Sequence, residues 1–313
     1  MREDTPILVA IYCMVYNHEA FLRKCFDGFA MQKTDFRYVA VIHEDCSTDN
    51  SAAIIREYTQ KYPDMFIPIY ESENMYPKHD GSIERIMKKA IDATGCKYVA
   101  FCEGDDYWTD PYKLQKQVDF METHPDYSVT FHRCWHLNVN TGEKQEDKCG
   151  ELFRNGENGV EINEEMFFSN WYTQPLTIVY RAECWVLEEM LQYRYYRDIH
   201  QIYHLLKHGK GYVFSFFGGV RTMHSGGVAS MISRKEYCDV SLPMDGEFYW
   251  KTREKGPKKV YIETLDTCIR TYARTDKLKA LRCACIRFWV SKKMKHFVKN
   301  IKEIICAKKI DRL

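Results

Sequence analysis

The chain has 313 residues, of which 45% are hydrophobic and 28% charged, and its formal net charge is +1. This composition is typical of a folded globular protein and excludes extended disorder. The nearly balanced charge excludes nucleic acid as an expected partner of the whole molecule. No apolar run approaches the roughly 20 residues of a membrane span, so we expect a cytoplasmic protein whose 13 cysteines are reduced thiols.

Strand and helix patterns alternate along the first 125 residues. Residues 7–15 form a continuous apolar run rich in β-formers, which is typical of a parallel strand buried on both faces. Asn17 is a candidate N-cap for the helix that follows. The other elements expected here are strands at 38–43, 67–70 and 97–102, and helices beginning near Ala53, at Ile83 and after Asp110.

This order predicts right-handed βαβ units and a parallel sheet with helices on both faces. Polar and acidic residues follow three of the expected strands, at Tyr16, at Glu44 and Asp45, and at residues 103–106. Ligands of such sheets bind at the carboxyl ends of the strands. The sequence therefore predicts one polar, acidic crevice at this edge of the sheet.

The pattern is looser after residue 125. The expected elements are strands at 127–137, 176–181, 211–217 and 220–224, an exposed loop or hairpin at 142–159, and helices at 182–191 and 198–208. We therefore predict a catalytic domain at 1–230, with a donor half at about 1–125 and an acceptor half at about 126–230. A helical extension is expected at 231–313.

The most informative stretch is Glu103-Gly104-Asp105-Asp106. Adjacent carboxylates at the end of a buried strand repel one another, and a cation would neutralise them. Hard ions such as Mg²⁺ and Mn²⁺ take oxygen ligands and often bridge carboxylates and substrate phosphates. A solvated acidic turn before a helix is the alternative interpretation of these residues.

Three segments together resemble the GT-A family 2 glycosyltransferases: Val9 to Glu19, Glu44 to Ser51, and Tyr98 to Trp108. Those enzymes have a strand ending in Tyr-Asn, a DDGSTD loop and a DxD metal motif. The resemblance covers residues 7 to about 125 and implies a GT-A-like α/β fold with a mostly parallel central sheet. Glu44 replaces the usual first aspartate and Cys46 the usual glycine, which leaves the base specificity open.

The resemblance also implies roles for single residues. Asp45 would contact the donor base, Tyr16 would lie against the nucleotide, and Glu103 would belong to the same donor site. Asp105 and Asp106 would hold the ribose and the metal, Mn²⁺ or Mg²⁺, that bridges the diphosphate of a nucleoside-diphosphate sugar. From the residues alone, Tyr16 could instead be core, and Asp49 is better explained as a helix cap.

Two further residues complete the expected site. An inverting transferase needs a base on the acceptor side, and the resemblance points to Asp198, with an ordinary N-cap as the alternative and His200 as a weaker substitute. His224 lies in the segment 221–228, which resembles the closing element of related capsule and lipopolysaccharide enzymes. It would be a third metal ligand or a phosphate donor, and the glycines after it would permit a mobile loop. The alternative is a surface histidine.

The predicted function is transfer of a sugar, with inversion, to a hydroxyl of a glycan or lipid-linked acceptor in bacterial surface glycan synthesis. One alternative is a sugar nucleotidyltransferase, but the Gly-rich phosphate loop that such enzymes carry after the first strand is not present in residues 16–19. The other alternative is a non-catalytic binding protein of the same fold.

The stretch 277–313 holds twelve Lys and Arg against two acids. Its apolar residues recur at helical spacing, which predicts one or two amphipathic helices. A cationic face beside Phe and Trp suits an anionic membrane surface, which would place the protein at the inner face of the cytoplasmic membrane. Packing of the apolar stripe on the rest of the protein is the alternative, and the sequence leaves both open.

Overall fold

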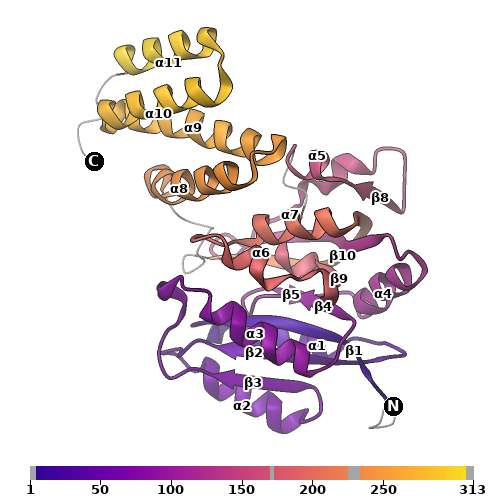
Figure 1. Ribbon diagram of the computed structural model, residues 1–313. Helices are drawn as coiled ribbons and strands as arrows, with labels where there is room; N and C mark the ends of the chain where they lie inside the picture. The colour runs from indigo at the N-terminus through magenta and orange to yellow at the C-terminus, as the bar shows by residue number, and fades with distance from the viewer. Residues whose placement is uncertain (1–4, 170–172, 225–232, 308–313) are drawn as a thin grey trace. The chain divides into compact units, whose positions relative to one another are not determined.

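The computed structural model describes residues 5–169, 173–224 and 233–307. The chain divides into two compact units, Met1–His224 and Ser225–Leu313, and each is described by itself (Figure 1). All 13 cysteines are free thiols, as expected.

Four parallel strands form the first half of the sheet in the first unit. Their spatial order is β3 (Phe66–Tyr70), β2 (Arg37–Glu44), β1 (Ile7–Val15) and β4 (Tyr98–Phe101). The central pair is mostly apolar and almost wholly buried along its length, as a parallel strand covered on both faces requires. The predicted parallel α/β core is confirmed in this half.

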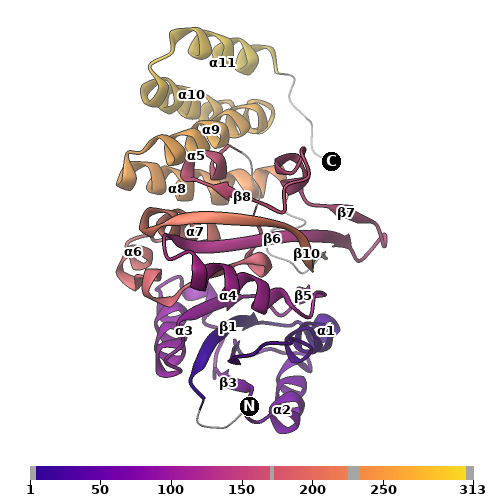
Figure 2. The same cartoon turned by 90° about the vertical axis from the view of Figure 1, so that its right-hand side faces the viewer.

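Helices cover both faces of these strands. Helices α1 (Glu19–Ala30) and α2 (Ser51–Lys61) lie on one side of the strands and α3 (Ser82–Ala93) lies on the other (Figure 2). Alternate residues of β1, including Val9 and Ile11, pack in one cluster with apolar residues of α1 and α2. The period of two along a strand therefore divides the core into two layers.

Helix α4 (Lys113–Thr123) begins later than the sequence suggested. Asp110 accepts a hydrogen bond at 2.8 Å from the amide of Tyr112 through Oδ1. Its side chain thus closes a turn two residues long and does not cap the helix, because Asp competes for nearby backbone amides in turns as readily as at caps.

The second half of the sheet is mixed. Strand β10 (Lys210–Met223) pairs in parallel with β6 (Tyr127–Asn138), while β9 (Val179–Arg181) is antiparallel to both β4 and β6. The two separate strands expected at 211–217 and 220–224 are one strand, whose pairing register shifts between Phe214 and Gly219. Bulges keep such a strand continuous while bending it, and this is hard to read from residue types.

The remaining elements of this unit are short. The segment expected as a strand at 176–181 begins with a 3₁₀ turn, Pro175–Thr177, and the segment expected as a helix at 182–191 is a 3₁₀ turn followed by α6. The strands and helices not yet named are β5 (Tyr107–Trp108), β7 (Lys144–Glu146), β8 (Gly159–Ile162), α5 (Glu164–Phe167), α6 (Leu187–Leu191) and the longer α7 (Asp198–His208), and 3₁₀ turns also lie at Tyr76–Lys78 and Lys148–Leu152.

The second unit is helical, as expected for the C-terminal extension. It consists of α8 (Arg234–Thr252), α9 (Lys255–Thr275), α10 (Lys277–Ser291) and α11 (Met294–Cys306). Its core is built around Leu265, Cys268 and Ile269 of α9. Among the helices of the described residues, none has the length and apolar character needed to cross a bilayer.

Candidate active site

The three strand ends that carry the polar motifs are neighbours, because β1 lies between β2 and β4. The amide of Asp45 donates to the carbonyl of Val15 at 3.0 Å, and the amide of Gly104 donates to that of Met14 at 2.9 Å. Both acidic loops are thus fixed to the end of the same central strand. The predicted convergence of the three motifs is confirmed.

The first two motif loops hold each other in place. The amide of Asn17 donates to Ser47 Oγ at 3.0 Å, and the amide of Thr48 donates to Asn17 Oδ1 at 2.7 Å. Asn17 has a φ of 56°, in the left-handed region that Asn tolerates better than most residues. Its prediction as a helix N-cap is wrong, since its side chain binds the neighbouring loop and His18 takes the capping position.

Asp49 belongs to the same loop pair. Its carboxylate accepts the amides of Ser51, the first residue of α2, and of Glu19, both at 2.9 Å. Burial tends to raise the pKa of Asp49, but the hydrogen bonds from Ser51 and Glu19 outweigh it and the pKa lies below its usual value. Asp49 thus lies beside the first residues of α1 and α2, but Asn50 takes the capping position of α2, so Asp49 is not itself the predicted cap.

Asp45, the expected contact of the donor base, is buried with both carboxylate oxygens occupied. Oδ1 accepts the amide of Met75 at 2.6 Å and Oδ2 accepts that of Tyr76 at 3.0 Å. The carboxylate therefore orders the loop before α3, while Tyr16 lies exposed beyond the end of β1. Nothing in the motif itself signals the contact with Tyr76, which sequence reasoning missed.

The carboxylates of Glu103, Asp105 and Asp106 each offer an oxygen, and these atoms lie within 4.8 Å of one another. Burial and the charges of Asp105 and Asp198 raise the pKa of Glu103 to about 8, against the opposing charge of Arg221. Burial and the other two carboxylates raise the pKa of Asp106 well above its usual range. A divalent cation would add positive charge to these three crowded carboxylates.

Gly104 separates these acids for a steric reason. A Cβ at this position would stand 2.8 Å from His18 Nδ1 and 3.0 Å from a methyl group of Val15. Any larger residue would push the loop away from β1 and α1. The glycine therefore lets the acidic loop lie against the central strand.

The last core strand brings its partners to the acidic loop. The amide of Thr222 donates to Asp106 Oδ1 at 2.8 Å, and His224 Nε2 lies 3.0 Å from Asp105 Oδ2. His18 Nε2 lies 4.0 Å from the same oxygen of Asp105. The structure thus places His224 beside the predicted metal-binding carboxylates, and the glycines after it lie outside the described residues.

The residues fit a divalent cation. Glu103, Asp105 and Asp106 offer oxygen atoms, and His224 beside Asp105 offers an imidazole nitrogen, a donor set that Mn²⁺ would accept readily and Mg²⁺ less so. Burial first, and the neighbouring carboxylates second, raise the pKa values of Glu103 and Asp106, and a bound cation would lower them.

Asp198 is the first residue of α7, and Arg197 takes the capping position. Its Oδ1 accepts the amide of Ile199 at 2.9 Å. Burial raises the pKa of Asp198, opposed mainly by the hydrogen bond from Ile199 and by the charges of Arg197 and Arg221. A carboxylate with a raised pKa is a better proton acceptor, whereas His200 is fully buried and its pKa is lowered to about 3 by burial.

Arg221 was not predicted as a site residue, although it lies in the segment that contains His224. Its charge opposes the rise in pKa of Glu103, Asp106 and Asp198. It is thus a cationic neighbour shared by the acidic groups of both motifs. Arg221 directly precedes Thr222 on β10, and this place in the sequence could have identified it as a site residue.

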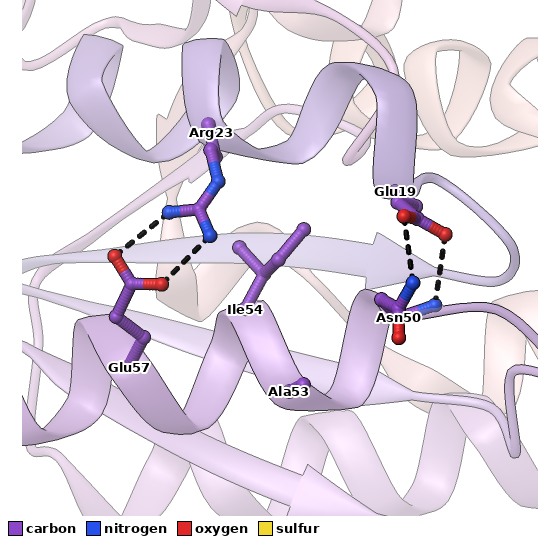
Figure 3. Close-up of a pocket in the computed structure, with 6 residues that line it drawn as sticks. All are labelled: Glu19, Arg23, Asn50, Ala53, Ile54 and Glu57. Carbon is purple, nitrogen blue, oxygen red and sulfur yellow. Dashed lines mark hydrogen bonds and ion pairs between the residues drawn. The ribbon is translucent and has the colours of Figure 1, made fainter.

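A hollow of about 410 Å³ lies elsewhere, over α1 and α2. Figure 3 shows that a two-pronged ion pair between Arg23 and Glu57 and two hydrogen bonds between Glu19 and Asn50 cross it. The charged groups that line the hollow are already paired with each other or with Asn50. These contacts connect α1 to α2, and the hollow does not form part of the site.

Comparison with known proteins agrees with this arrangement. The fold and the acidic strand ends define a glycosyltransferase of GT-A fold. The family described as Glycosyl transferase family 2 matches residues 11–168, about half of the chain, and the chain belongs to that family.

Sequence relatives match less than half of the chain. "Uncharacterized protein Rv1520" of Mycobacterium tuberculosis is 41% identical over 124 residues, which are 40% of this chain and 34% of that protein. "Putative teichuronic acid biosynthesis glycosyltransferase TuaG" of Bacillus subtilis is 28% identical over 114 residues, 36% of this chain and 42% of its own length. The matched stretch therefore spans about a third to two fifths of these relatives.

Solved structures match over nearly the whole chain. TarS 1–349 of S. aureus, solved in complex with UDP-GlcNAc, has a TM-score of 0.63 and 16% identity and covers 95% of this chain and 90% of its own. The mannosyltransferase PcManGT of Pyrobaculum calidifontis, solved with GDP-Man and Mn²⁺, has a TM-score of 0.54 and 12% identity, covering 96% of this chain and 86% of its own. At this identity the similarity shows the fold.

Proposed function

We propose that the protein is a metal-dependent, inverting glycosyltransferase that moves a sugar from a nucleoside diphosphate to a hydroxyl acceptor. The observation that carries the proposal is the cluster of Glu103, Asp105 and Asp106 beside His224, with Asp198 within its electrostatic field. Family membership supports sugar transfer and disfavours the sugar nucleotidyltransferase alternative.

Different residues of the chain would bind the metal and accept the proton. Asp105, Asp106 and His224 would hold Mn²⁺ or Mg²⁺, which when bound supplies Lewis-acid stabilisation of the departing diphosphate. Asp198 would accept the proton of the acceptor hydroxyl as that oxygen attacks the anomeric carbon. Asp198 is suited to this step because its raised pKa brings it closer to neutral pH.

The donor would lie over the ends of β1 and β2. Tyr16 offers an exposed aromatic ring there, and Asp45 holds the backbone that follows β3. Asp45 could contact the donor base only if one of its two hydrogen bonds to the 75–76 loop were broken. We therefore propose that donor binding rearranges this loop, and Tyr76 with it.

The setting we propose is bacterial surface glycan synthesis at the inner face of the cytoplasmic membrane, with a glycan or lipid-linked acceptor. Support comes from the similarity to TuaG, named as a teichuronic acid biosynthesis glycosyltransferase, and from the cationic C-terminal helices. Such an enzyme needs to reach an acceptor held at a membrane.

A donor screen tests the proposal. Purified protein is incubated with several nucleoside-diphosphate sugars, with and without Mn²⁺, and both diphosphate release and thermal shift are measured. We expect one donor to raise the melting temperature and release its diphosphate only when the metal is present. Thermal shifts without release for every donor and acceptor would favour the non-catalytic alternative.

A further inference from the structure

Helix α10 carries an exposed apolar stripe. Leu278, Leu281, Cys285 and Trp289 follow one another at intervals of three and four residues, so they lie on one face. Leu278 is 78% exposed and Trp289 is 55% exposed. Exposed large apolar side chains in a contiguous row mark an interaction surface.

Helix α11 carries a second stripe of the same kind. Met294, Val298 and Ile305 are exposed, with Ile305 at 69%, and their spacing also places them on one face. The amine of Lys277 lies 3.4 Å from the carbonyl of Ile305, so the start of α10 lies beside the end of α11. The two helices form a hairpin with a stripe on each arm.

The residues of the two exposed stripes do not belong to the hydrophobic core of the helical unit. Other apolar residues of the same helices, such as Ala284, Val290 and Ile304, are buried in the helical core, and Phe297 packs against it. The sequence left packing and membrane binding open for this segment. In the structure, one face of each of these two helices packs inward and the other face remains exposed.

The exposed charge of the hairpin is predominantly positive. Arg287 is buried in an ion pair with Asp266 and does not contribute to the surface. Glu303 is the acidic residue of the two helices. The exposed cations are Lys277, Lys279, Arg282, Lys292, Lys293, Lys295, Lys299 and Lys302.

Trp289, near the end of α10, lies beside an aromatic ring and a cation. Its ring centroid lies 5.0 Å from that of Trp250, and the amine of Lys292 lies 4.8 Å from its centroid. A half-exposed indole with a cation beside it suits the boundary between lipid headgroups and acyl chains.

We propose that the exposed stripes and cations of α10 and α11, here called the hairpin surface, bind an anionic lipid bilayer. Apolar side chains would enter the headgroup boundary while the lysines contact lipid phosphates. A second copy of the chain fits less well, because a two-fold contact would place the same cationic surface against itself. The proposal rests on the proposed function only for its purpose, which is to bring the enzyme to a lipid-linked acceptor.

Co-sedimentation of the full chain with lipid vesicles tests the hairpin surface. We expect binding to vesicles of phosphatidylglycerol and phosphatidylcholine at low salt, with weaker binding at high salt because exposed charges are screened. Pure phosphatidylcholine vesicles should bind at least about tenfold less. Equal binding to both vesicles, or no binding to anionic vesicles at low salt, would overturn the proposal.

The apolar contribution is tested by combining Leu278→Gln, Trp289→Gln and Ile305→Gln. Because all three side chains are exposed, fold and melting temperature should be kept, and vesicle binding should fall about tenfold or more. The matched control combines Tyr237→Gln and Val240→Gln, two exposed residues of α8, and should bind as the parent does. Unchanged binding of the triple variant would contradict the assignment.

The charged contribution is tested by combining Lys292→Gln, Lys293→Gln and Lys295→Gln. Its control combines Lys235→Gln, Lys255→Gln and Lys259→Gln, which lie on other helices of the unit, so both variants lose the same charge. Only the first should lose affinity for anionic vesicles and become less salt-dependent. Equal losses in both variants would show attraction by overall charge and overturn a defined surface.

Two further readouts keep the outcomes apart. Sedimentation velocity without lipid would reveal a dimer that the apolar triple variant loses, and that result would assign the surface to a second copy instead. Sugar transfer to a soluble acceptor should be unchanged in all four variants. Vesicle binding without any transfer would sink the proposed function and leave the hairpin surface intact, whereas transfer without binding would do the reverse.

Discussion

The two units differ in how far along the chain their polar contacts reach. In the first unit, Asp105 meets His224 across 119 positions and Asp106 meets Thr222 across 116. In the helical unit, Asp245 meets Thr264 across 19 positions and Asp266 meets Arg287 across 21. The first unit gathers its chemistry from distant segments, whereas the second is built from neighbouring helices.

This difference predicts different responses to substitution. A site assembled from distant loops depends on each contact, because no local element restores a lost one. The hairpin surface distributes its binding over many exposed side chains, each with a small contribution. Single substitutions should therefore abolish chemistry in the first unit and only weaken binding in the second.

The largest effect is expected at the acidic cluster. Asp105→Asn or Asp106→Asn should lower turnover about 1000-fold, since the several kcal/mol that a bound metal contributes to the transition state would be lost. Turnover is measured at saturating Mn²⁺ and melting by circular dichroism, with the exposed Asp64→Asn as the control. Full activity in the double variant would refute the metal assignment.

The next effect concerns the proposed base. Asp198→Asn should lower kcat by about 10² to 10⁴, the usual contribution of a general base, while donor affinity measured by calorimetry stays the same. Asp126→Asn, at an exposed acid, is the control. If turnover persists and only the melting temperature falls, Asp198 serves the start of α7 and not the reaction.

A stability effect within the first unit is expected at Lys113. Burial lowers the pKa of this lysine to about 7, while its amine lies 3.9 Å from the centroid of the Trp108 ring. Between pH 7 and 10 the unfolded chain therefore binds a proton that the folded chain lacks, so stability rises with pH through this window. Below pH 7 the amine is charged in both states and the cost of burying it is largest.

Lys113→Met should accordingly raise the free energy of unfolding by about 2 kcal/mol at pH 7, less than the full pKa shift implies because the contact with Trp108 is lost. The gain should shrink toward pH 10. Urea unfolding at several pH values measures it, with the exposed Lys116→Met as control. A gain that is constant with pH would show that Lys113 stays charged in the folded protein.

The smallest effect tests the contact between the motif loops. Asn17→Gly should cost about 1 kcal/mol of stability through the lost hydrogen bond to Thr48. Asn17→Ala should cost about 1 kcal/mol more, because alanine is strained at a positive φ. Thermal melts of the two variants measure the difference. Equal melting temperatures would show that the left-handed conformation of Asn17 is relaxed when the side chain is removed.

The sequence allowed the position of the acidic cluster to be predicted because parallel strands meet at their carboxyl ends, which is a property of the fold and not of particular contacts. It did not allow the roles of Asn17 or of the Asp45 carboxylate to be predicted. Those depend on which loop lies opposite, and loop conformation follows from tertiary contacts. The same holds for Arg221, whose importance comes from the acids that it faces.

The amphipathic helices show a second limit. Helical spacing identified the apolar residues of 277–306 correctly. The spacing does not distinguish Trp289, which is exposed, from Ile304, which is buried. Which of them is buried depends on where α9 lies, because a helix with apolar residues around much of its circumference offers more than one face to pack.

The hydrogen bond from Thr222 to Asp106 has a consequence for synthesis. A ribosome makes the three carboxylates of the acidic loop long before it makes β10, and a nascent chain folds from its N-terminal side. Until residue 224 has left the ribosome, Asp106 lacks its amide partner and Asp105 lacks His224. The nascent chain thus holds the acidic loop before β10 is present to contact it. Catalytic competence should therefore arise only in the last stage of folding of the first unit.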